Sequence, residues 1–410
     1  MRVKPVFGTG LIVMENTNSK IKAFESFNNT FKYCTYGMVF SNIYPNKTNM
    51  KRRLYLYIFI VFCTSPCLIS YAYSCRFYIM QQDMFNLTRH LAVGIVIGLY
   101  LFKVLYCILN TNKFESILNT VSCDMIDVNE FDDGAKKLYG LFLKKAKLGE
   151  LIWALLPIIL GLQFPVYAGI VMIHENIWKD YPQREMVHEM EITFAKDVKY
   201  DSPVFEIIFV ISTASCIILI PNFCGLDGSF CIATTHLGFK LKYVGYLVRE
   251  AFEDCNDSFE LHVKMKHATK CHQKALQFYK ELQDFYGPWL LGIFIVTSSL
   301  IAFNLYQMYI IQRLHPKYVL FAVAAILHMY VPCVYASNVT EFGEDLATEL
   351  YCAAWERKFD ISATKSVIIM LANAQRPLIL TGCGIVTYNM QLFITVMKST
   401  YSFYTLITST

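Results

Sequence analysis

The chain has 410 residues, of which 55% are hydrophobic and only 17% are charged. This composition excludes an ordinary soluble protein, which carries more charge, and a disordered chain, which has far fewer apolar residues. The net charge of +5 is small and its basic residues are spread over many segments, so no nucleic-acid partner is expected. The sequence therefore predicts an integral membrane protein.

Seven apolar stretches are each about long enough to cross a bilayer, which takes roughly 20 residues. No cleavable signal peptide is visible before the first stretch, since the preceding segment is polar and ends in Lys51-Arg52-Arg53. The predicted fold class is all-α, a polytopic membrane protein of seven transmembrane helices. The spans are expected near residues 54–74, 89–109, 149–173, 204–224, 288–311, 317–336 and 383–408.

The distribution of Lys and Arg predicts the orientation, because cytoplasmic segments hold the excess of positive residues. With a cytoplasmic amino terminus, the interior segments hold 26 of the 37 basic residues and the exterior segments hold 9. Seven crossings then place the carboxyl terminus outside the cell. This topology is opposite to that of a G-protein-coupled receptor.

Four regions follow from this layout. We expect a cytoplasmic amino-terminal segment, a six-helix bundle with cytoplasmic helical extensions, a set of cytoplasmic anchor helices, and a final helix with the extracellular end. Their predicted bounds are 1–53 for the first, 54–336 with extensions at 234–285 for the second, 337–382 for the third and 383–410 for the fourth.

The cytoplasmic extensions carry apolar side chains at helical spacing, which predicts two amphipathic helices. One stripe runs from Leu237 to Phe252 and the other from Ala268 to Phe285, with a turn between Glu253 and Ser258. Such stripes pack either against each other or against another subunit. For an anchor or subunit interface the candidate residues are Phe278, Leu282, Tyr351 and Trp355.

The final stretch carries polar side chains at intervals of three or four residues, which places them on one helical face. A polar stripe within a bilayer is costly unless it faces protein or water, so this helix is a candidate pore lining. The stripe consists of Thr387, Gln391, Thr395, Lys398, Ser402, Thr405 and Ser409.

Aromatic and small residues in the outer halves of spans three to six share a similar depth, which suggests a mostly apolar ligand pocket. The candidates are Phe164, Tyr167, Phe209, Ser212, Tyr306, Tyr318 and Phe321. Of the five glycosylation sequons, the topology exposes only Asn86.

The signals for catalysis are negative. No phosphate loop, zinc motif or nucleophile motif occurs, so no enzyme activity, no cofactor and no metal is expected. Among ionisable groups in spans, Lys103 is expected to snorkel toward the cytoplasmic interface, and His328 to be a packing residue. Arg376 is read as the junction between a cytoplasmic helix and the last span.

The carboxyl-terminal region closely resembles the end of insect odorant receptors. The resemblance is carried by Tyr351-Cys-Ala-Ala-Trp355, by Arg376-Pro377-Leu378 with Thr381-Gly382, and above all by Lys398-Ser-Thr-Tyr-Ser-Phe-Tyr-Thr-Leu406. Asp227 and His236 after span four, together with the inverted seven-span layout, extend it over nearly the whole chain.

The resemblance implies a tuning subunit that joins an odorant co-receptor in a four-subunit, non-selective cation channel of the plasma membrane in sensory dendrites. In that family small volatile ligands enter an outer-half pocket, and the last helix of each subunit lines the pore. Carried over to this sequence, the gate falls at Thr405, Leu406 and Ser409.

Three alternative classes of membrane protein fit the sequence less well. A gustatory-type receptor channel is less favoured, since Ile394 and Thr395 stand where that ending has Gln-Phe. A G-protein-coupled receptor requires motifs after span three and near the end that do not occur. A transporter typically shows an internal repeat, and no convincing repeat is present.

Overall fold

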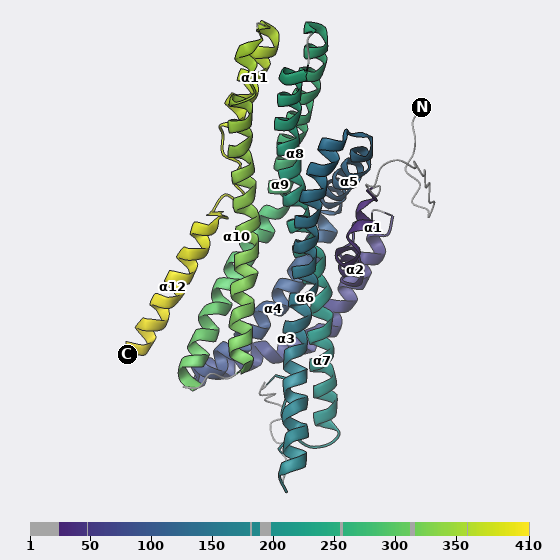
Figure 1. The fold of residues 1–410 in the computed structure, drawn as a ribbon. Coiled ribbons are helices and arrows are strands. Elements are labelled where there is room, and N and C mark those ends of the chain that lie inside the picture. The colour runs from purple at the N-terminus through teal and green to yellow at the C-terminus, as the bar shows by residue number, and fades with distance from the viewer. Residues whose placement is uncertain are drawn as a thin grey trace.

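A computed structural model describes residues 24–46, 48–180, 183–188, 198–254, 257–311, 316–358 and 360–409. It is a bundle of long helices, and one end of it is extended by a narrower group of helices, with α11 at its tip (Figure 1). The long helices follow from the sequence, because only helices can satisfy every backbone hydrogen bond of an apolar run inside a bilayer.

Six helical segments in the described part of the chain are long and apolar enough to span a membrane. The final helix, α12, has twenty residues but is not among these six. The six segments contain α3 (Met50–Gln81), α4 (Met84–Leu109), α6 (Asp133–Trp178), α7 (Val204–Asn222), α9 (Ser258–Ile311) and α10 (Pro316–Tyr351). The predicted seventh span corresponds to α12 (Met390–Ser409).

Several of these helices run well past the predicted spans. Helix α6 begins at Asp133 and α9 at Ser258, so the extensions of these helices beyond the predicted spans are continuous with the apolar segments. Helix α7 continues through a π-helical turn, η3 (Phe223–Asp227), into α8 (Gly228–Asp254). Helix α8 ends at Asp254 and α9 begins at Ser258, which agrees with the turn predicted between Glu253 and Ser258.

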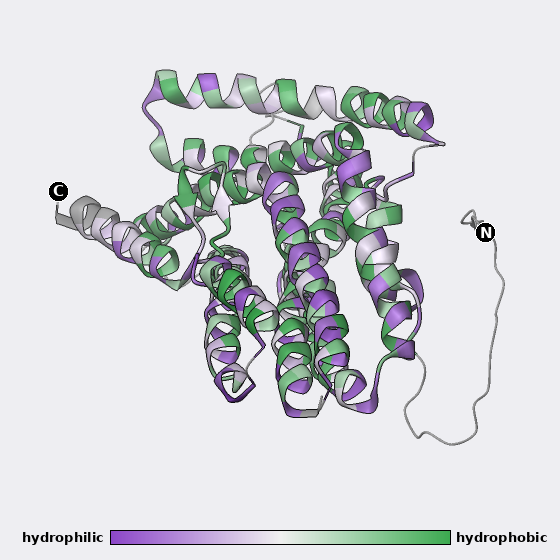
Figure 2. Cartoon of the chain, turned by 90° about the horizontal axis from the view of Figure 1, so that it is seen from above, coloured by the Kyte–Doolittle hydropathy of each residue, from purple (hydrophilic) through white to green (hydrophobic). Residues whose placement is uncertain are grey.

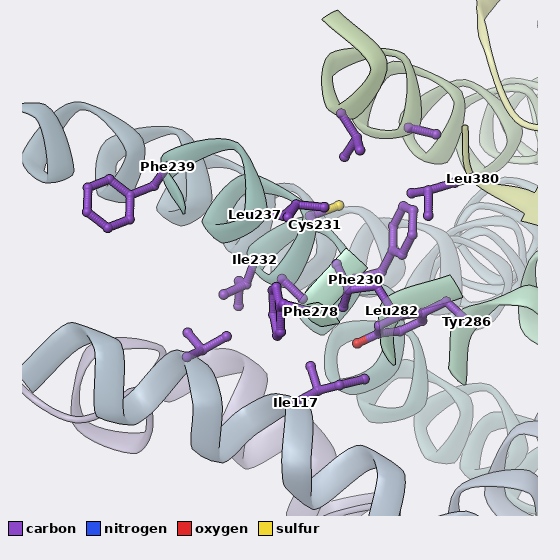
Figure 3. Packing of buried hydrophobic residues seen from close by; sticks show 14 of the residues in the cluster. Ile117, Phe230, Cys231, Ile232, Leu237, Phe239, Phe278, Leu282, Tyr286 and Leu380 are labelled. Carbon is purple, nitrogen blue, oxygen red and sulfur yellow. The ribbon is translucent and has the colours of Figure 1, made fainter. Parts of the chain in front are cut away.

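Shorter helices pack around this extended end, which we call the neck. They are α1 (Phe27–Thr30), α2 (Lys32–Phe40), α5 (Thr111–Asp127) and the 3-10 turn η1 (Val128–Glu130). Both predicted apolar stripes of α8 and α9 are turned into the core of the chain, where Leu237, Phe278 and Leu282 lie beside Ile117 of α5 (Figure 3). The two helices therefore pack within one chain.

The far end of the neck is formed by the end of α10, a 3-10 turn η4 (Trp355–Arg357) and α11 (Ile361–Ala374). Asp360 caps α11, because its carboxylate accepts a hydrogen bond from the N–H of Ala363 at 2.8 Å. The same carboxylate accepts from the hydroxyl of Ser258 at 2.6 Å, which ties α11 to the start of α9.

The segment after α11 corrects one predicted boundary. The last span was expected to begin at Cys383, but residues before Met390 form a small antiparallel hairpin of β1 (Thr381–Gly382) and β2 (Val386–Thr387). The turn needs positive φ angles at Cys383 and Gly384, 54° and 73°, which glycine adopts readily. Thr387 therefore belongs to a strand and not to the polar stripe of the final helix.

Candidate functional site

Helix α12 packs mainly against α9 and α10 and then extends away from the bundle, as Figures 1 and 2 show. Its buried face carries Val396 and Thr400, four residues apart. On its other side Gln391, Thr395, Lys398 and Ser402 are all exposed. The predicted polar stripe therefore faces away from the rest of its own chain. Thr405 is half-buried, while the side chains of Leu406 and Ser409 lie outside the described set.

The start of α12 is held firmly by polar contacts. Asn389 caps the helix, since its side-chain oxygen accepts from the N–H of Leu392 at 2.8 Å. The hydroxyl of Tyr388 donates to the carbonyl oxygen of Leu290 on α9 at 2.6 Å, and the N–H of Met390 donates to Ser337 on α10 at 3.0 Å. The helix is thus fixed to α9 and α10 just where it begins.

The hydroxyl groups of the exposed face bond back to their own helix. Thr395 donates to the carbonyl oxygen of Gln391 at 2.8 Å, and Ser402 donates to that of Lys398 at 3.0 Å. Each hydroxyl proton is then satisfied internally while the oxygen lone pairs point outward. Such a surface suits weak contact with water or cations.

The predicted pocket residues are joined through Phe164 of α6. Its ring lies 5.8 Å from that of Phe321 on α10 and 5.0 Å from His188, which belongs to the loop between α6 and α7. The Nε2 atom of His188 is 3.4 Å from the sulfur of Cys216 on α7. Ser212, one turn before Cys216, is buried. Spans three, four and six therefore meet here beneath one loop.

The remaining pocket candidates lie on the same helices but are less closely joined. Tyr167, Phe209, Tyr306 and Tyr318 are each half-buried. The ring of Phe209 packs against that of Phe205, 5.9 Å away on its own helix. His188 was not predicted as a pocket residue, because nothing in the sequence shows that a loop residue folds down between three spans.

A buried ion pair inside the bundle overturns the prediction for Lys103. The side chain of Lys103 is fully buried, and its Nζ atom lies 2.8 Å and 2.9 Å from the two carboxylate oxygens of Asp227. It also sits 4.1 Å above the ring of Phe223. Snorkelling to the interface is therefore wrong, because a carboxylate on η3 supplies the ammonium with a partner inside the bundle.

Two further helices reach the same carboxylate. The indole N–H of Trp289 on α9 donates to one oxygen at 2.9 Å, and the Nε2 atom of His328 on α10 lies 3.2 Å from the other. Asp227 thus joins α4, α9 and α10 to its own helix. We call Lys103, Asp227, Trp289 and His328 the ion centre. In the sequence its signals were three ionisable residues in or beside apolar spans and the part that Asp227 has in the family resemblance.

A second charged cluster lies in the neck. Asp124 of α5 accepts hydrogen bonds from Lys240 and, at 2.9 Å, from the imidazole of His236 on α8. Burial alone raises the pKa of Asp124, but the hydrogen bonds and the positive charge of Lys240 outweigh it and hold the pKa at about 2. Burial lowers the pKa of His236, and the hydrogen bond to Asp124 opposes this effect.

The anchor candidates separate into two groups. Phe278 and Leu282 are buried within the chain, whereas Tyr351 is exposed and Trp355 is half-buried at the tip of the neck. Asn86 lies in the first turn of α4 rather than in a loop, and its amide nitrogen donates to Asp83 at 2.7 Å. No group of side chains that could hold a metal ion occurs among the residues described.

Known proteins match this chain over most of its length. A family model described as "7tm Odorant receptor" matches residues 83–401. Among curated proteins, Odorant receptor 13a of Drosophila melanogaster is 24% identical over 160 residues, covering 36% of this chain and 38% of that protein. Odorant receptor 10 of Aedes albopictus is 23% identical over 222 residues, covering 51% of this chain and 56% of that protein. The matches thus span 38% and 56% of the length of these two relatives.

The fold is also that of a solved receptor. The olfactory receptor OR5 of Machilis hrabei, in complex with eugenol, superposes with a TM-score of 0.72 at 15% sequence identity, covering 93% of this chain and 98% of that one. A second structure of the same receptor superposes with a TM-score of 0.71. Since the family model covers well over half of the residues, the chain belongs to the insect odorant receptor family.

Proposed function

We propose that this receptor is a tuning subunit that binds a small volatile molecule and opens a cation-permeable pore together with an odorant co-receptor. As a family member it is a multi-pass protein of the plasma membrane. The observation that carries the channel is the outward-facing stripe of α12. A polar helical face that meets no other part of its own chain has to meet water or another subunit.

The proposed pore face consists of Gln391, Thr395, Lys398 and Ser402, continuing toward a gate at Thr405, Leu406 and Ser409. Hydroxyl oxygens along this face provide weak polar contacts for hydrated cations. Four subunits around one axis would bring four such faces together. The amino terminus then lies in the cytoplasm and the outer end of α12 at the cell exterior, as the basic residues predict.

The proposed ligand site is the junction of Phe164, Phe321, Ser212, Cys216 and His188. Its walls are aromatic rings and small side chains, which fit an apolar molecule with one polar group. Ligand binding opens the pore to the extent that the ligand binds the open arrangement more tightly than the closed one. Tyr167, Phe209, Tyr306 and Tyr318 extend this wall.

Current recordings with cysteine-modified receptors test the pore. The receptor is expressed with a co-receptor and challenged with a panel of volatile alcohols, esters, aldehydes and phenols. In Ser402→Cys, a charged thiol reagent applied from the bath during stimulation is expected to reduce the evoked current. Thr400→Cys is the matched control, since Thr400 lies on the buried face of the same helix. The unsubstituted receptor controls for native cysteines.

Two results would contradict the proposal. Loss of the fast current after G-protein blockade would show that this receptor does not form the channel, because the current would then pass through another protein. Equal reagent sensitivity at 400 and 402, or none at 402 after proven labelling, would show that the exposed stripe of α12 faces something other than the conduit.

A further inference from the structure

We propose that Asp227 is the coupling residue of this receptor: it links span four, which carries the ligand site, to the two helices that hold the pore helix. The inference rests on the proposed function. Cys216 and Ser212 of the proposed pocket lie on α7, and the same continuous helix carries Asp227 on η3. Movement of α7 on ligand binding therefore reaches the carboxylate through covalent structure.

From Asp227 the contacts lead directly to α12. The carboxylate accepts from the indole N–H of Trp289 at 2.9 Å, and the next residue, Leu290, accepts from the hydroxyl of Tyr388 at 2.6 Å. Tyr388 lies two residues before Met390, where α12 begins. Asp227 and the residue just before the pore helix are thus joined by two hydrogen bonds, through the side chain of Trp289 and the peptide unit that follows it on α9.

A second contact runs through α10. The imidazole of His328 lies 3.2 Å from the other oxygen of Asp227, and Ser337 of the same helix accepts from the N–H of Met390 at 3.0 Å. Within the described chain, α9 and α10 are the main helices against which α12 packs. Both of them therefore contact Asp227, and both contact the start of α12.

The backbone around Asp227 is suited to change. Residues Phe223–Asp227 form a π-helical turn, a rare geometry that appears mostly at functional positions. Asn222, just before it, is fully buried, yet neither its amide oxygen nor its amide nitrogen has a hydrogen-bond partner. A buried amide without partners costs free energy in this arrangement. Any rearrangement of the turn that gives Asn222 a partner would recover part of that cost.

Close packing gives the turn a fixed support on its other side. A Cβ added to Gly225 would meet the backbone nitrogen of Met38 at 2.8 Å, and one added to Gly37 would meet the backbone nitrogen of Gly225 at the same distance. Helix α2 therefore touches η3 backbone to backbone, which only glycine permits. The turn is held between this contact and the ion centre.

Two conservative substitutions break the path without disturbing the ion pair. Trp289→Phe removes the indole N–H that reaches Asp227, and Tyr388→Phe removes the hydroxyl that reaches Leu290. Each is expected to raise the ligand concentration for half-maximal current about tenfold, with unchanged surface amount. The double variant completes a double-mutant cycle. Because both residues lie on one path, the double variant is expected to raise the half-maximal ligand concentration no further than the larger of the two single changes.

Tyr106→Phe is the matched control. The hydroxyl of Tyr106 on α4 donates to the carbonyl oxygen of Phe285 on α9 at 2.6 Å. The substitution therefore removes a hydrogen bond of the same kind between two helices, at a place away from the path. Its effect is expected to be small and to add to that of Trp289→Phe. The probe is the most effective volatile of the panel, applied to receptors with a co-receptor, and surface amount is measured by biotinylation.

A variant of the ion pair separates coupling from folding. Lys103→Met alone leaves an uncompensated buried carboxylate and is expected to reduce the surface amount, whereas Lys103→Met with Asp227→Leu removes both charges and restores it. The restored double variant is expected to give at least tenfold less evoked current per receptor. Full current in that variant, or strictly additive shifts in Trp289→Phe and Tyr388→Phe, would overturn the inference. Silence of the unsubstituted receptor would instead refute the proposed function.

Discussion

The α8–α9 pair and α12 both carry a regular stripe of side chains, but the two stripes meet opposite surroundings. The apolar stripes of α8 and α9 are covered by the chain itself, with Leu282 and Phe278 in its core. The polar stripe of α12 is left uncovered. A helical period thus tells which residues share a face, while the fold decides whether the partner of that face lies in the same chain.

The largest effect is expected in the neck, where Leu282→Ala removes a side chain from the packed face of α9. Removing a fully buried leucine side chain is expected to cost about 2–5 kcal/mol, since a cavity remains among its neighbours. Thermal denaturation of the purified receptor in detergent measures the loss. Phe259→Ala is the control on the same helix, because Phe259 is 74% exposed. Equal destabilisation by both would mean that the stripe is not the packed face.

The charged cluster of the neck gives the next effect. With its pKa near 2 in the folded chain, against about 3.9 unfolded, the carboxylate of Asp124 contributes about 2–3 kcal/mol at neutral pH. Because this pKa is depressed, the contribution is present above pH 4 and is lost as the pH falls toward 2. Protonation of His236 below its ordinary pKa, near 6.5, disfavours folding as well, since burial lowers the pKa of that group.

Asp124→Asn is therefore expected to lower the denaturation temperature at pH 7 and to match the unsubstituted receptor more closely at pH 3. Denaturation curves over this pH range make the measurement. A difference that is independent of pH would show that the carboxylate charge does not provide the stability.

A substitution at Phe164 tests whether the residues around it form a ligand site or only stabilise the helix bundle. Phe164→Ala removes the ring that joins Phe321 and His188, so about 1–2 kcal/mol of ligand contact is expected to be lost. The half-maximal ligand concentration then rises roughly 5–30-fold. Ile170→Ala on the exposed face of α6 serves as control. An unchanged half-maximal concentration for every panel ligand would show that Phe164 is not part of the ligand site.

The smallest change is expected at Lys398, on the α12 side of the comparison. If this ammonium lines the conduit it repels permeating cations, so Lys398→Gln raises single-channel conductance by at most about fivefold, given water and salt around the charge. Single-channel recording measures it, with Lys365→Gln on exposed α11 as control. Unaltered conductance would place Lys398 away from the conduit.

The ion centre shows why part of the site could not be predicted. Lys103, Asp227 and His328 are separated by about one hundred residues or more along the chain, and each alone has an ordinary explanation at its own position. An ammonium near the inner end of a span is expected to reach water when no partner is known. Only the packing of α4, η3 and α10 brings a carboxylate within 2.8 Å of it.

The hairpin before α12 is a similar case at a boundary. Arg376-Pro377 and the Gly382-Cys383-Gly384 run correctly indicated a break in the chain, and α11 indeed ends at Ala374. They did not show that the chain would pair β1 with β2 before turning into the last helix. Hydropathy cannot distinguish such a hairpin from a helix, because Ile379, Leu380 and Ile385 are apolar in either structure.

By itself the sequence determined the membrane class, the helical fold, the faces of α8, α9 and α12, and the family, because all of these depend on local composition and periodicity. The tertiary structure decided which charges pair, which loop reaches the outer pocket and which stripe is left without a partner. Those outcomes depend on contacts between residues far apart in the chain, and a contact of that kind leaves no periodic trace in either of the segments that form it.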